Sequence, residues 1–489
     1  EKFRRNAKKV DEEVRGVLVE QMKEAVEIDD KQIKVFKNLE SLFGSEERGW
    51  DQLKSPYEGV EMQIKRKNQN GEKLSAALAK AECTADCTAE EAAAWHFEYC
   101  SRERRSKDSN PVRLEIMMRG EGAVKSNEKI FASVKQMPFL LHNREFLFKN
   151  IYRKNEDESI QVATDSMPVK DKIDYGKRMS TVRATTKILF TATNIQNVGD
   201  IPQCKISFKQ YFDFGGFVPV GLLNSKIQSS LKAMKGLKDS FQRDEDVDRC
   251  ELDRLADIIR NEKQDYDVDE NQAISEGKEF YMNCKKSDNF DELESPDHMV
   301  KMQLVHVEGS PIAVGFCEAV LDASIEECIA YEFKKDLREK KANLKARRVV
   351  EQHIRKLSDH SQLYHSIREL GTRSLLRNRE WYMKGVWKYE GLGKAWIVYE
   401  DTKEFDKEYK LKSGNVQASA KTTWLFEEEK NNEGIPRTRV SYATQQDIRG
   451  LINVPTRLMK NAAVKQAKIM IKMRKKFDKS REIDTFNRL

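Results

Sequence analysis

The sequence predicts an α+β protein built from two tandem copies of one domain, each a curved antiparallel sheet wrapped on a long C-terminal helix. One observation behind this prediction is internal repetition, because Asn143-Arg144-Glu145-Phe146 returns as Asn378-Arg379-Glu380-Trp381. Other segments recur at the same offset of about 235–240 residues, which is too long for a solenoid repeat of roughly 20–50 residues. The other observation is the order of elements in each copy: helix, two strands, short helix, about six strands and long helix.

The first elements of each copy follow from local patterns. Residues 1–47 carry apolar residues at helical spacing among charges, which predicts helix. Alternating apolar and polar residues then predict two strands in each copy. A short helix follows, because a hydroxyl with a glutamate three residues later forms a capping box at Thr88 and Glu91, and again at Ser324 and Glu327.

The longer strands alternate clearly, as in CKISFKQYF at 204–212 and TRVSYATQQ at 438–446. Short turns between them imply antiparallel pairing. Each copy ends in a long helix, at about 219–241 and 455–477, and such a helix can lie across the open face of a curved sheet. That arrangement encloses a space that is either filled by side chains or left as a ligand cavity.

The repeats divide the chain into five parts. They are a helical linker at 1–27, a first domain at 28–241, a charged helical linker at 242–267, a second domain at 268–477 and a tail or linker at 478–489. The first residues resemble the later linker, so we interpret them as the end of a preceding repeat. Because the chain starts at Glu1 and not at Met, we expect it to be part of a longer array of such domains.

The composition argues against several classes of function. The net charge of +7 comes from 88 basic and 81 acidic residues, without the concentrated basic stripe of a nucleic-acid-binding domain. Eight cysteines form no CxxC pair, so we expect reduced thiols in an intracellular protein. None of the seven histidines recurs in both copies or forms HExxH, and GxSxG, P-loop and GxGxxG motifs are absent. We therefore expect no nucleic acid, no metal, no cofactor and no enzymatic activity.

The ends of the two copies carry a family resemblance. FVPVGLLNSKI is similar to a signature in which an apolar residue and Pro are followed, after two residues, by Leu, an apolar residue and Asn. The matching residues are Pro219, Leu222, Leu223 and Asn224 in the first copy, and Pro455, Leu458 and Met459 in the second. Lys460 stands where the second copy should have Asn. The Asn-Arg-Glu-aromatic segments are similar to the Pro-Arg-Asp-Phe strand opening of the same family.

On these motifs the chain resembles the START (StAR-related lipid-transfer) domain family, in tandem, over about 28–241 and 268–477. The resemblance implies a helix-grip fold with an apolar cavity that holds one lipid or sterol, closed by the terminal helix. The residues expected at the ligand are Phe217, Val218, Pro219, Leu222, Leu223, Ile227, Ile452, Val454, Pro455, Leu458 and Met459. Trp387 and Trp396 are candidates for an aromatic wall of this cavity, although cross-strand packing in a core is the more common reason for such a cluster.

The end of the second terminal helix is basic, with Lys472, Arg474, Lys475 and Lys476. We expect these residues to contact an anionic membrane surface; the alternative is an ordinary solvated helix face. No apolar run approaches the roughly 18–20 residues that span a membrane, and the N-terminus has no signal-peptide profile. The expected location is therefore cytoplasmic, with peripheral membrane contact left open.

The expected function is lipid binding, transfer or sensing without catalysis. Two alternatives remain open at this point. One is a scaffold whose cavities have filled in and whose domains bind proteins. The other is a cyclase or aromatase of the same fold, which needs inward acid and base groups that the two copies do not share.

Overall fold

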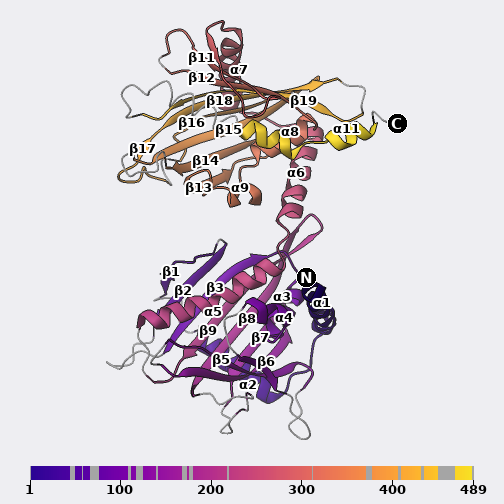
Figure 1. Ribbon diagram of the computed structural model, residues 1–489, viewed down its shortest axis with the longest axis vertical. Helices are drawn as coiled ribbons and strands as arrows, with labels where there is room; N and C mark the ends of the chain where they lie inside the picture. The colour runs from indigo at the N-terminus through magenta and orange to yellow at the C-terminus, as the bar shows by residue number, and fades with distance from the viewer. Residues whose placement is uncertain are drawn as a thin grey trace. The chain divides into compact units, whose positions relative to one another are not determined.

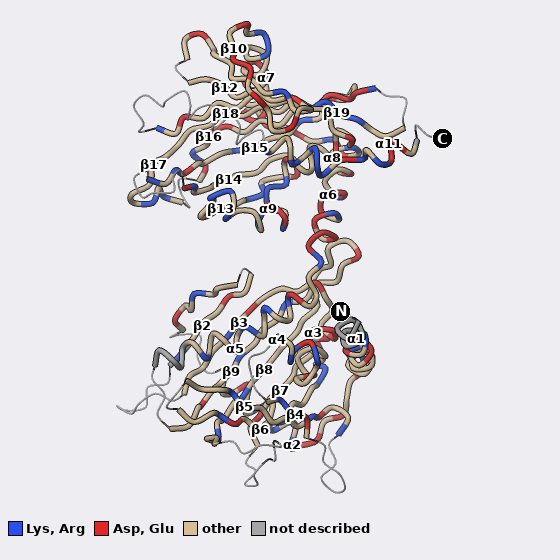
Figure 2. The backbone as a smooth tube through the Cα atoms, viewed as in Figure 1, with Lys and Arg blue, Asp and Glu red and all other residues tan. Residues whose placement is uncertain are grey.

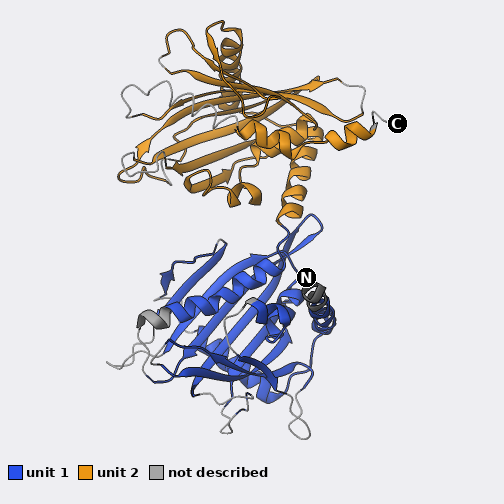
Figure 3. Cartoon of the chain, in the orientation of Figure 1, with its two compact units in different colours: residues 1–243 blue, residues 244–489 orange. Residues whose placement is uncertain are grey.

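The computed structural model describes most of the chain. Outside the description lie residues 1, 45–49, 58, 67–75, 108–111, 117–124, 139–140, 168–172, 174, 176–179, 217–219, 311, 370–376, 406–408, 431–433, 450–467 and 487–489, together with the side chains of 2–8, 66, 107, 220–224 and 486. The chain forms two compact units, residues 1–243 and 244–489 (Figure 3). Each unit is α+β and contains one large, mainly antiparallel sheet.

Unit 1 contains nine strands and five helices among its described residues (Figure 1). The helices are α1 (Lys2–Lys23), α2 (Asp30–Gly44), α3 (Ala89–Phe97), α4 (Arg102–Lys107) and α5 (Val220–Ser240). The strands are β1 (Asp51–Leu53), β2 (Val60–Arg66), β3 (Ala76–Ala85), β4 (Val112–Ile116), β5 (Glu128–Lys135), β6 (Asn143–Lys154), β7 (Ile160–Ser166), β8 (Thr181–Val198) and β9 (Ile201–Asp213). The order across the sheet is β1-β2-β3-β9-β8-β7-β6-β5-β4.

Unit 2 repeats this order of elements. The helices are α6 (Asp244–Asn261), α7 (Val268–Lys286), α8 (Ile325–Phe333), α9 (Arg338–Ala342) and α11 (Ser480–Phe486), and residues 468–476 are also helical. The strands are β10 (Phe290–Glu292), β11 (Lys301–Val305), β12 (Val314–Leu321), β13 (Val349–Lys356), β14 (Ser361–Arg368), β15 (Arg379–Gly391), β16 (Lys394–Asp401), β17 (Val416–Gln417), β18 (Ser419–Glu429) and β19 (Arg437–Asp447). The order across the sheet is β10-β11-β12-β19-β18-β16-β15-β14-β13.

Each sheet has two covered faces. In unit 1, α5 lies along one face, which we call the inner face, and buries Ile227, Leu231 and Met234 against it. Helix α2 covers the opposite, outer face and buries Phe36. Strand alternation separates the two sides, so that neighbouring residues of one strand belong to different cores. Leu189 faces α2, for example, while the next residue, Phe190, faces α5.

Unit 2 is layered in the same way. Met470 and Met473, in the helical segment 468–476, pack on the inner face of its sheet. Helix α7 covers part of the outer face through Tyr281 and Cys284. The inner and outer faces of the two units can therefore be compared position by position.

The two segments that we expected to be linkers pack into the units. Helix α1 contacts α3 and α4, and the Asp11 carboxylate accepts hydrogen bonds from the backbone N–H groups of Arg102 and Glu103 at 3.2 and 2.8 Å. Helix α6 contacts α8 and α9 and buries Leu255, Ala256 and Ile259. Its apolar stripe, at helical spacing among many charges, is what gives it a packing face.

The pairing at these helices is repeated. Asp248 of α6 accepts from the backbone N–H groups of Arg338 and Glu339 at 2.8 and 2.9 Å, as Asp11 does at the start of α4. A carboxylate at these N–H groups satisfies donors that the first turn of a helix leaves unpaired.

Charges are spread over both units, with basic and acidic residues interspersed along the helices and strands (Figure 2). Among the described residues, none of the helices combines the length and the apolar character needed to span a membrane.

Candidate ligand-binding interior

Both Asn-Arg-Glu motifs hold the segment that follows the last long strand of their unit. Arg144 donates hydrogen bonds to the backbone carbonyl oxygens of His142, Phe214 and Gly215. Arg379 donates in the same way to Arg377, Ile448 and Arg449. Each arginine lies at the beginning of its strand, β6 or β15. Its hydrogen bonds connect that strand to a segment about 70 residues later in the sequence. In unit 1 that segment leads into α5, so the arginine fixes the approach of the C-terminal helix to the sheet.

The interior under α5 is strongly aromatic. Phe146, Phe212 and Phe214 contact one another at ring-centre distances of 5.5–6.2 Å. Phe131 and Tyr99 extend this lining toward α3, with ring centres 5.6 Å apart. Such a wall provides a large apolar surface with little conformational freedom.

Lys135, the last residue of β5, brings a cation to this apolar wall. Its ammonium lies 5.2 Å from the centre of the Phe212 ring and 5.7 Å from that of Phe146. Burial lowers the pKa of Lys135 to about 7, and the neighbouring cations Arg113 and Lys226 act in the same direction. Within the described part of the chain, no carboxylate forms an ion pair with Lys135. Lys135 as a whole is half-buried, and its ammonium has no anionic partner among the described residues.

Unit 2 has a cation at the matching position. Lys135 lies opposite Arg144 in the pairing of β5 with β6, and Arg368 lies opposite Arg379 in the pairing of β14 with β15. The Arg368 guanidinium lies 5.3 Å from the centre of the Trp381 ring. Both sheets therefore end the corresponding strand with a cation over an aromatic residue of the next strand.

The surroundings of the two cations differ. Arg368 donates a hydrogen bond of 3.3 Å from Nη2 to the hydroxyl of Tyr364, while its buried Nε has no partner among the described residues. Among the described residues, Lys135 has cation–π contacts only.

A second inward cation in each unit has a structural role. Arg104 donates from Nη1 to the backbone carbonyl oxygens of Trp95 and His96 at 3.1 and 2.8 Å. Lys340 donates to the backbone carbonyl oxygens of Tyr331, in the last turn of α8, and of Lys334, just after it. These hydrogen bonds satisfy the two cations within the protein, and they close the C-terminal ends of α3 and α8.

Most of the residues that we expected at the ligand lie where the structure gives no description. Phe217, Val218 and Pro219 are outside the described residues, as are Ile452, Val454, Pro455, Leu458 and Met459. The side chains of Leu222 and Leu223 are outside it too. Ile227 is described, and it is fully buried against the inner face of the sheet.

Trp387 and Trp396 do not form one wall, contrary to our expectation. Trp387 belongs to the inner core and donates from Nε1 to the Asp359 carbonyl oxygen at 2.9 Å. Trp396 belongs to the outer core, where its ring centre lies 5.5 Å from that of Tyr281 in α7. The register explains the difference, because Trp387 lies opposite Ile397, and the neighbouring Trp396 must then point to the other face.

The basic end of the last helical segment is partly used within the unit. Arg474 forms an ion pair with Asp297 at 3.1 Å, and Lys476 forms one with Glu339 at 3.0 Å. Lys472 and Lys475 are exposed. Lys476 is exposed as well, but among the described residues only Lys472 and Lys475 of these four form no ion pair.

A pocket of about 440 Å³ on the outer side of unit 2 is polar, with Glu400, Asp401, Lys421 and Asp447 among its lining residues. Burial raises the pKa of Glu400. An acyl chain gains nothing from such a lining.

Sequence reasoning missed Lys135 and Arg368. Lys135 follows Phe131 and Ser133 at alternate positions of β5, so its inward direction was readable from the strand period. The aromatic rings around it come from strands distant in sequence, and no local pattern indicates them.

Comparison with known proteins gives structural neighbours but no sequence match. No protein-family model matches the chain, and no curated protein matches it. Among solved structures, it is similar to human STARD10, with 20% identity, coverage of 47% of this chain and 87% of that one, and a TM-score of 0.33. It is also similar to human StAR-related lipid transfer protein 5, with 14% identity, 43% and 97% coverage and a TM-score of 0.33.

A third neighbour is a STAR-related lipid transfer protein from Xanthomonas axonopodis, with 17% identity, 40% and 98% coverage and a TM-score of 0.31. The structural neighbours are thus START lipid-transfer domains.

Proposed function

We propose that the protein is a non-enzymatic lipid-binding protein made of two tandem helix-grip units, and that unit 1 holds a lipid between its sheet and α5. The observation that supports this proposal best is Lys135, a cation at the edge of an aromatic interior with no anionic partner in the part of the chain that the structure describes. An amphipathic ligand with an anionic headgroup matches both properties at once. The headgroup would pair with Lys135, and the tail would lie along the apolar wall.

Burial of the acyl chain and pairing of the Lys135 charge would both contribute favourably to the binding free energy of such a ligand. Each methylene removed from water contributes about 0.8 kcal/mol, so a long acyl chain supplies most of the affinity. A buried, unpaired charge is unfavourable, and an anion beside Lys135 would remove that cost. A small inorganic anion would gain only the second contribution.

For unit 2, one observation favours the alternative of a filled interior. Trp424 and Tyr442 stack with ring centres 4.3 Å apart, and both are fully buried on the inner face with Trp387. Arg368 also has a hydrogen-bonding partner in Tyr364. A scaffold role for unit 2, alongside lipid binding in unit 1, is our second candidate.

The proposed carrier would act at membrane surfaces, where it would exchange its lipid. Lys472 and Lys475 are the exposed cations that we assign to docking on an anionic bilayer. Arg474 and Lys476 are assigned to the fold, through their ion pairs.

The test compares anionic and neutral lipids with the same acyl chains, phosphatidylserine and phosphatidylcholine, in a fluorescent-lipid binding assay on the full chain. Lys135→Met keeps the length of the side chain and removes its charge; we expect at least a 10-fold loss of affinity for the anionic lipid. Lys205→Met is the matched control, because Lys205 is exposed on β9. If the wild-type chain takes up neither lipid, or if both variants bind like wild type, the proposal is wrong.

A further inference from the structure

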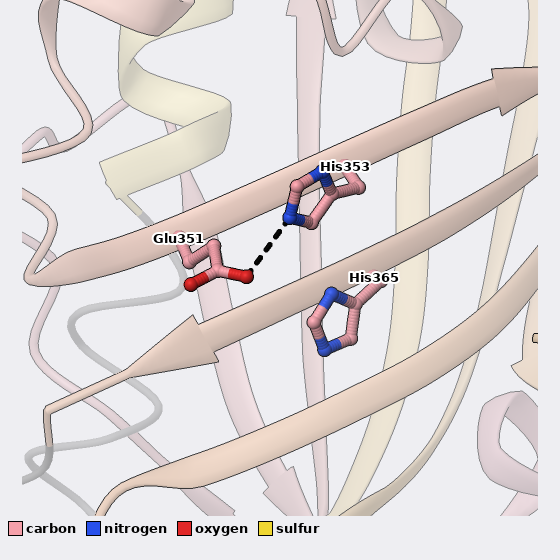
Figure 4. A group of neighbouring side chains, drawn as sticks. All are labelled: Glu351, His353 and His365. Atoms are coloured by element: carbon pink, nitrogen blue, oxygen red, sulfur yellow. Dashed lines mark hydrogen bonds and ion pairs between the residues drawn. The ribbon is translucent and has the colours of Figure 1, made fainter. Parts of the chain in front are cut away.

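Three side chains with metal-ligand chemistry lie on the outer face of the β13–β14 hairpin in unit 2 (Figure 4). Glu351 and His353 are two residues apart on β13 and therefore point to the same face. His365 lies directly opposite His353 in the strand register. One potential ligand atom from each of the three residues lies within 4.8 Å of the other two.

The surroundings of His365 are those of a metal-coordinating histidine. Its side chain is 1% exposed, and its Nε2 lies 3.3 Å from Oε2 of the buried Glu380. With the proton assigned to Nε2 in this hydrogen bond, Nδ1 carries a lone pair. That Nδ1 is buried and has no hydrogen-bond partner among the described residues. A carboxylate behind a histidine, with the other ring nitrogen free, is the arrangement that orients metal-binding histidines.

Glu351 and His353 complete the set from a more open position. Their side chains are 30% and 37% exposed, and Glu351 Oε1 lies 2.9 Å from His353 Nε2. Lys412 pairs with the other oxygen of Glu351. Tyr409 packs against His353, with ring centres 4.5 Å apart and ring planes tilted by 32°. The cluster is therefore buried on the His365 side and accessible on the Glu351 side.

We propose that Glu351, His353 and His365 bind one divalent cation of the zinc class, with a fourth coordination position open to water or to a donor from another molecule. Two imidazoles and one carboxylate form a nitrogen and oxygen donor set that suits Zn²⁺. Tetrahedral donors about 2.0–2.2 Å from zinc lie about 3.3–3.5 Å from one another. Small rotations of the two partly exposed side chains would close the present spacing to that value.

Unit 1 lacks the same site. Ala132 lies three residues before Lys135, as His365 lies three residues before Arg368, so the two occupy matching positions. Opposite Ala132 the register places Leu114. The surrounding cluster contains Ile130 and Leu147. The proposed cation therefore belongs to unit 2 alone and is independent of lipid binding.

The test is equilibrium dialysis of the full, EDTA-treated chain against zinc chloride, with bound zinc measured by elemental mass spectrometry. We expect one zinc per chain. His353→Gln and Glu351→Gln, both at partly exposed positions, should each weaken zinc binding by more than about 10-fold. Losing a residue that only orients a metal ligand already lowers metal affinity by about 10-fold or more. His306→Gln is the matched control: His306 also lies near a carboxylate, Asp291 at 3.8 Å, but without a third ligand.

Cobalt substitution then identifies the donors. A tetrahedral Co²⁺ spectrum without sulfur charge-transfer bands, lost in His353→Gln, would support the proposal. Sulfur bands would place the ion at the free cysteines and overturn it. Zinc binding that the two ligand variants leave unchanged, or no binding at micromolar zinc, would overturn it as well.

Discussion

Arg144 donates a hydrogen bond of 3.2 Å from Nη2 to the backbone carbonyl oxygen of Gly215. This contact joins the start of β6 to the turn before α5. Gly215 has a φ of +62°, and a Cβ there would lie 2.9 Å from the carbonyl oxygen of Arg183. Gly215 thus allows the conformation of the turn, and Arg144 holds the turn in place. In unit 2, Arg379 donates the corresponding hydrogen bond to the backbone carbonyl oxygen of Arg449 at 3.0 Å.

The first prediction concerns this contact. Arg144→Ala should lower the free energy of unfolding of unit 1 by about 3 kcal/mol, because it removes three charge-assisted hydrogen bonds and leaves the buried carbonyl group of Phe214 without this donor. Hydrogen exchange should quicken in α5. Arg144→Lys should restore little, since an ammonium cannot reach three carbonyls in the same fork geometry.

The matched control is Arg249→Ala, which removes an exposed ion pair with Asp246 within α6. Exposed pairs of this kind contribute less than about 1 kcal/mol. Equal denaturation curves for Arg144→Ala and Arg249→Ala would show that Arg144 does not anchor the turn.

The second prediction concerns pH. The pKa of Lys135 is lowered by burial to about 7 from its ordinary 10.5, so between these values the unfolded chain binds more protons than the folded one. The free energy of unfolding of unit 1 should therefore rise as the pH increases from about 7 toward 10.5. This gain in stability should be lost again as the pH falls toward 7. Lys135→Met should flatten this rise in denaturation midpoints measured at pH 7 and pH 9.

Lys135→Met should also stabilise the unliganded protein at pH 7. Replacing a half-buried charge that has no anionic partner by an apolar side chain of similar size removes the cost of taking that charge partly out of water. Lys205→Met should change neither the midpoint nor its pH dependence. A loss of stability in Lys135→Met at pH 7 would mean that the Lys135 ammonium already has favourable interactions within the folded protein. It would then need no anionic ligand as a partner.

The third prediction concerns docking. Lys472→Glu with Lys475→Glu should reduce sedimentation with phosphatidylserine vesicles by about 10-fold or more at low salt, because each cation near an anionic surface contributes about 1 kcal/mol. Wild-type binding should weaken as salt is added. The control is Lys263→Glu with Lys403→Glu, which makes the same change in net charge at two other exposed lysines. Equal sedimentation of the two double variants would leave the helix end as ordinary surface.

The sequence allowed the prediction of features that depend on local pattern. Strand alternation and the capping boxes at Thr88 and Ser324 are each visible within a few residues of sequence. The Asn-Arg-Glu segments are equally short, and their recurrence can be found by comparing the sequence with itself. The structure shows two large sheets with matching strand order. The role of Arg144 was not predictable, because its partner Gly215 is distant in sequence.

Features that depend on register or on long-range contacts escaped prediction. The face of Trp396 is set by the β15–β16 hairpin, whose register shifts between Tyr389 and Gly391. One residue of shift reverses every later side chain. The group Glu351, His353 and His365 follows no helical metal motif, and only the pairing of β13 with β14 brings it together. The packing of α6 on α8 is likewise a tertiary contact.

The central claim is that unit 1 holds a lipid, and native mass spectrometry of the full chain after exposure to mixed liposomes tests it most directly. We predict a bound mass that corresponds to one anionic phospholipid per chain, retained by Lys205→Met and strongly reduced in Lys135→Met. A wild-type spectrum with only the bare protein mass, recorded under conditions that preserve lipid complexes, would contradict the claim.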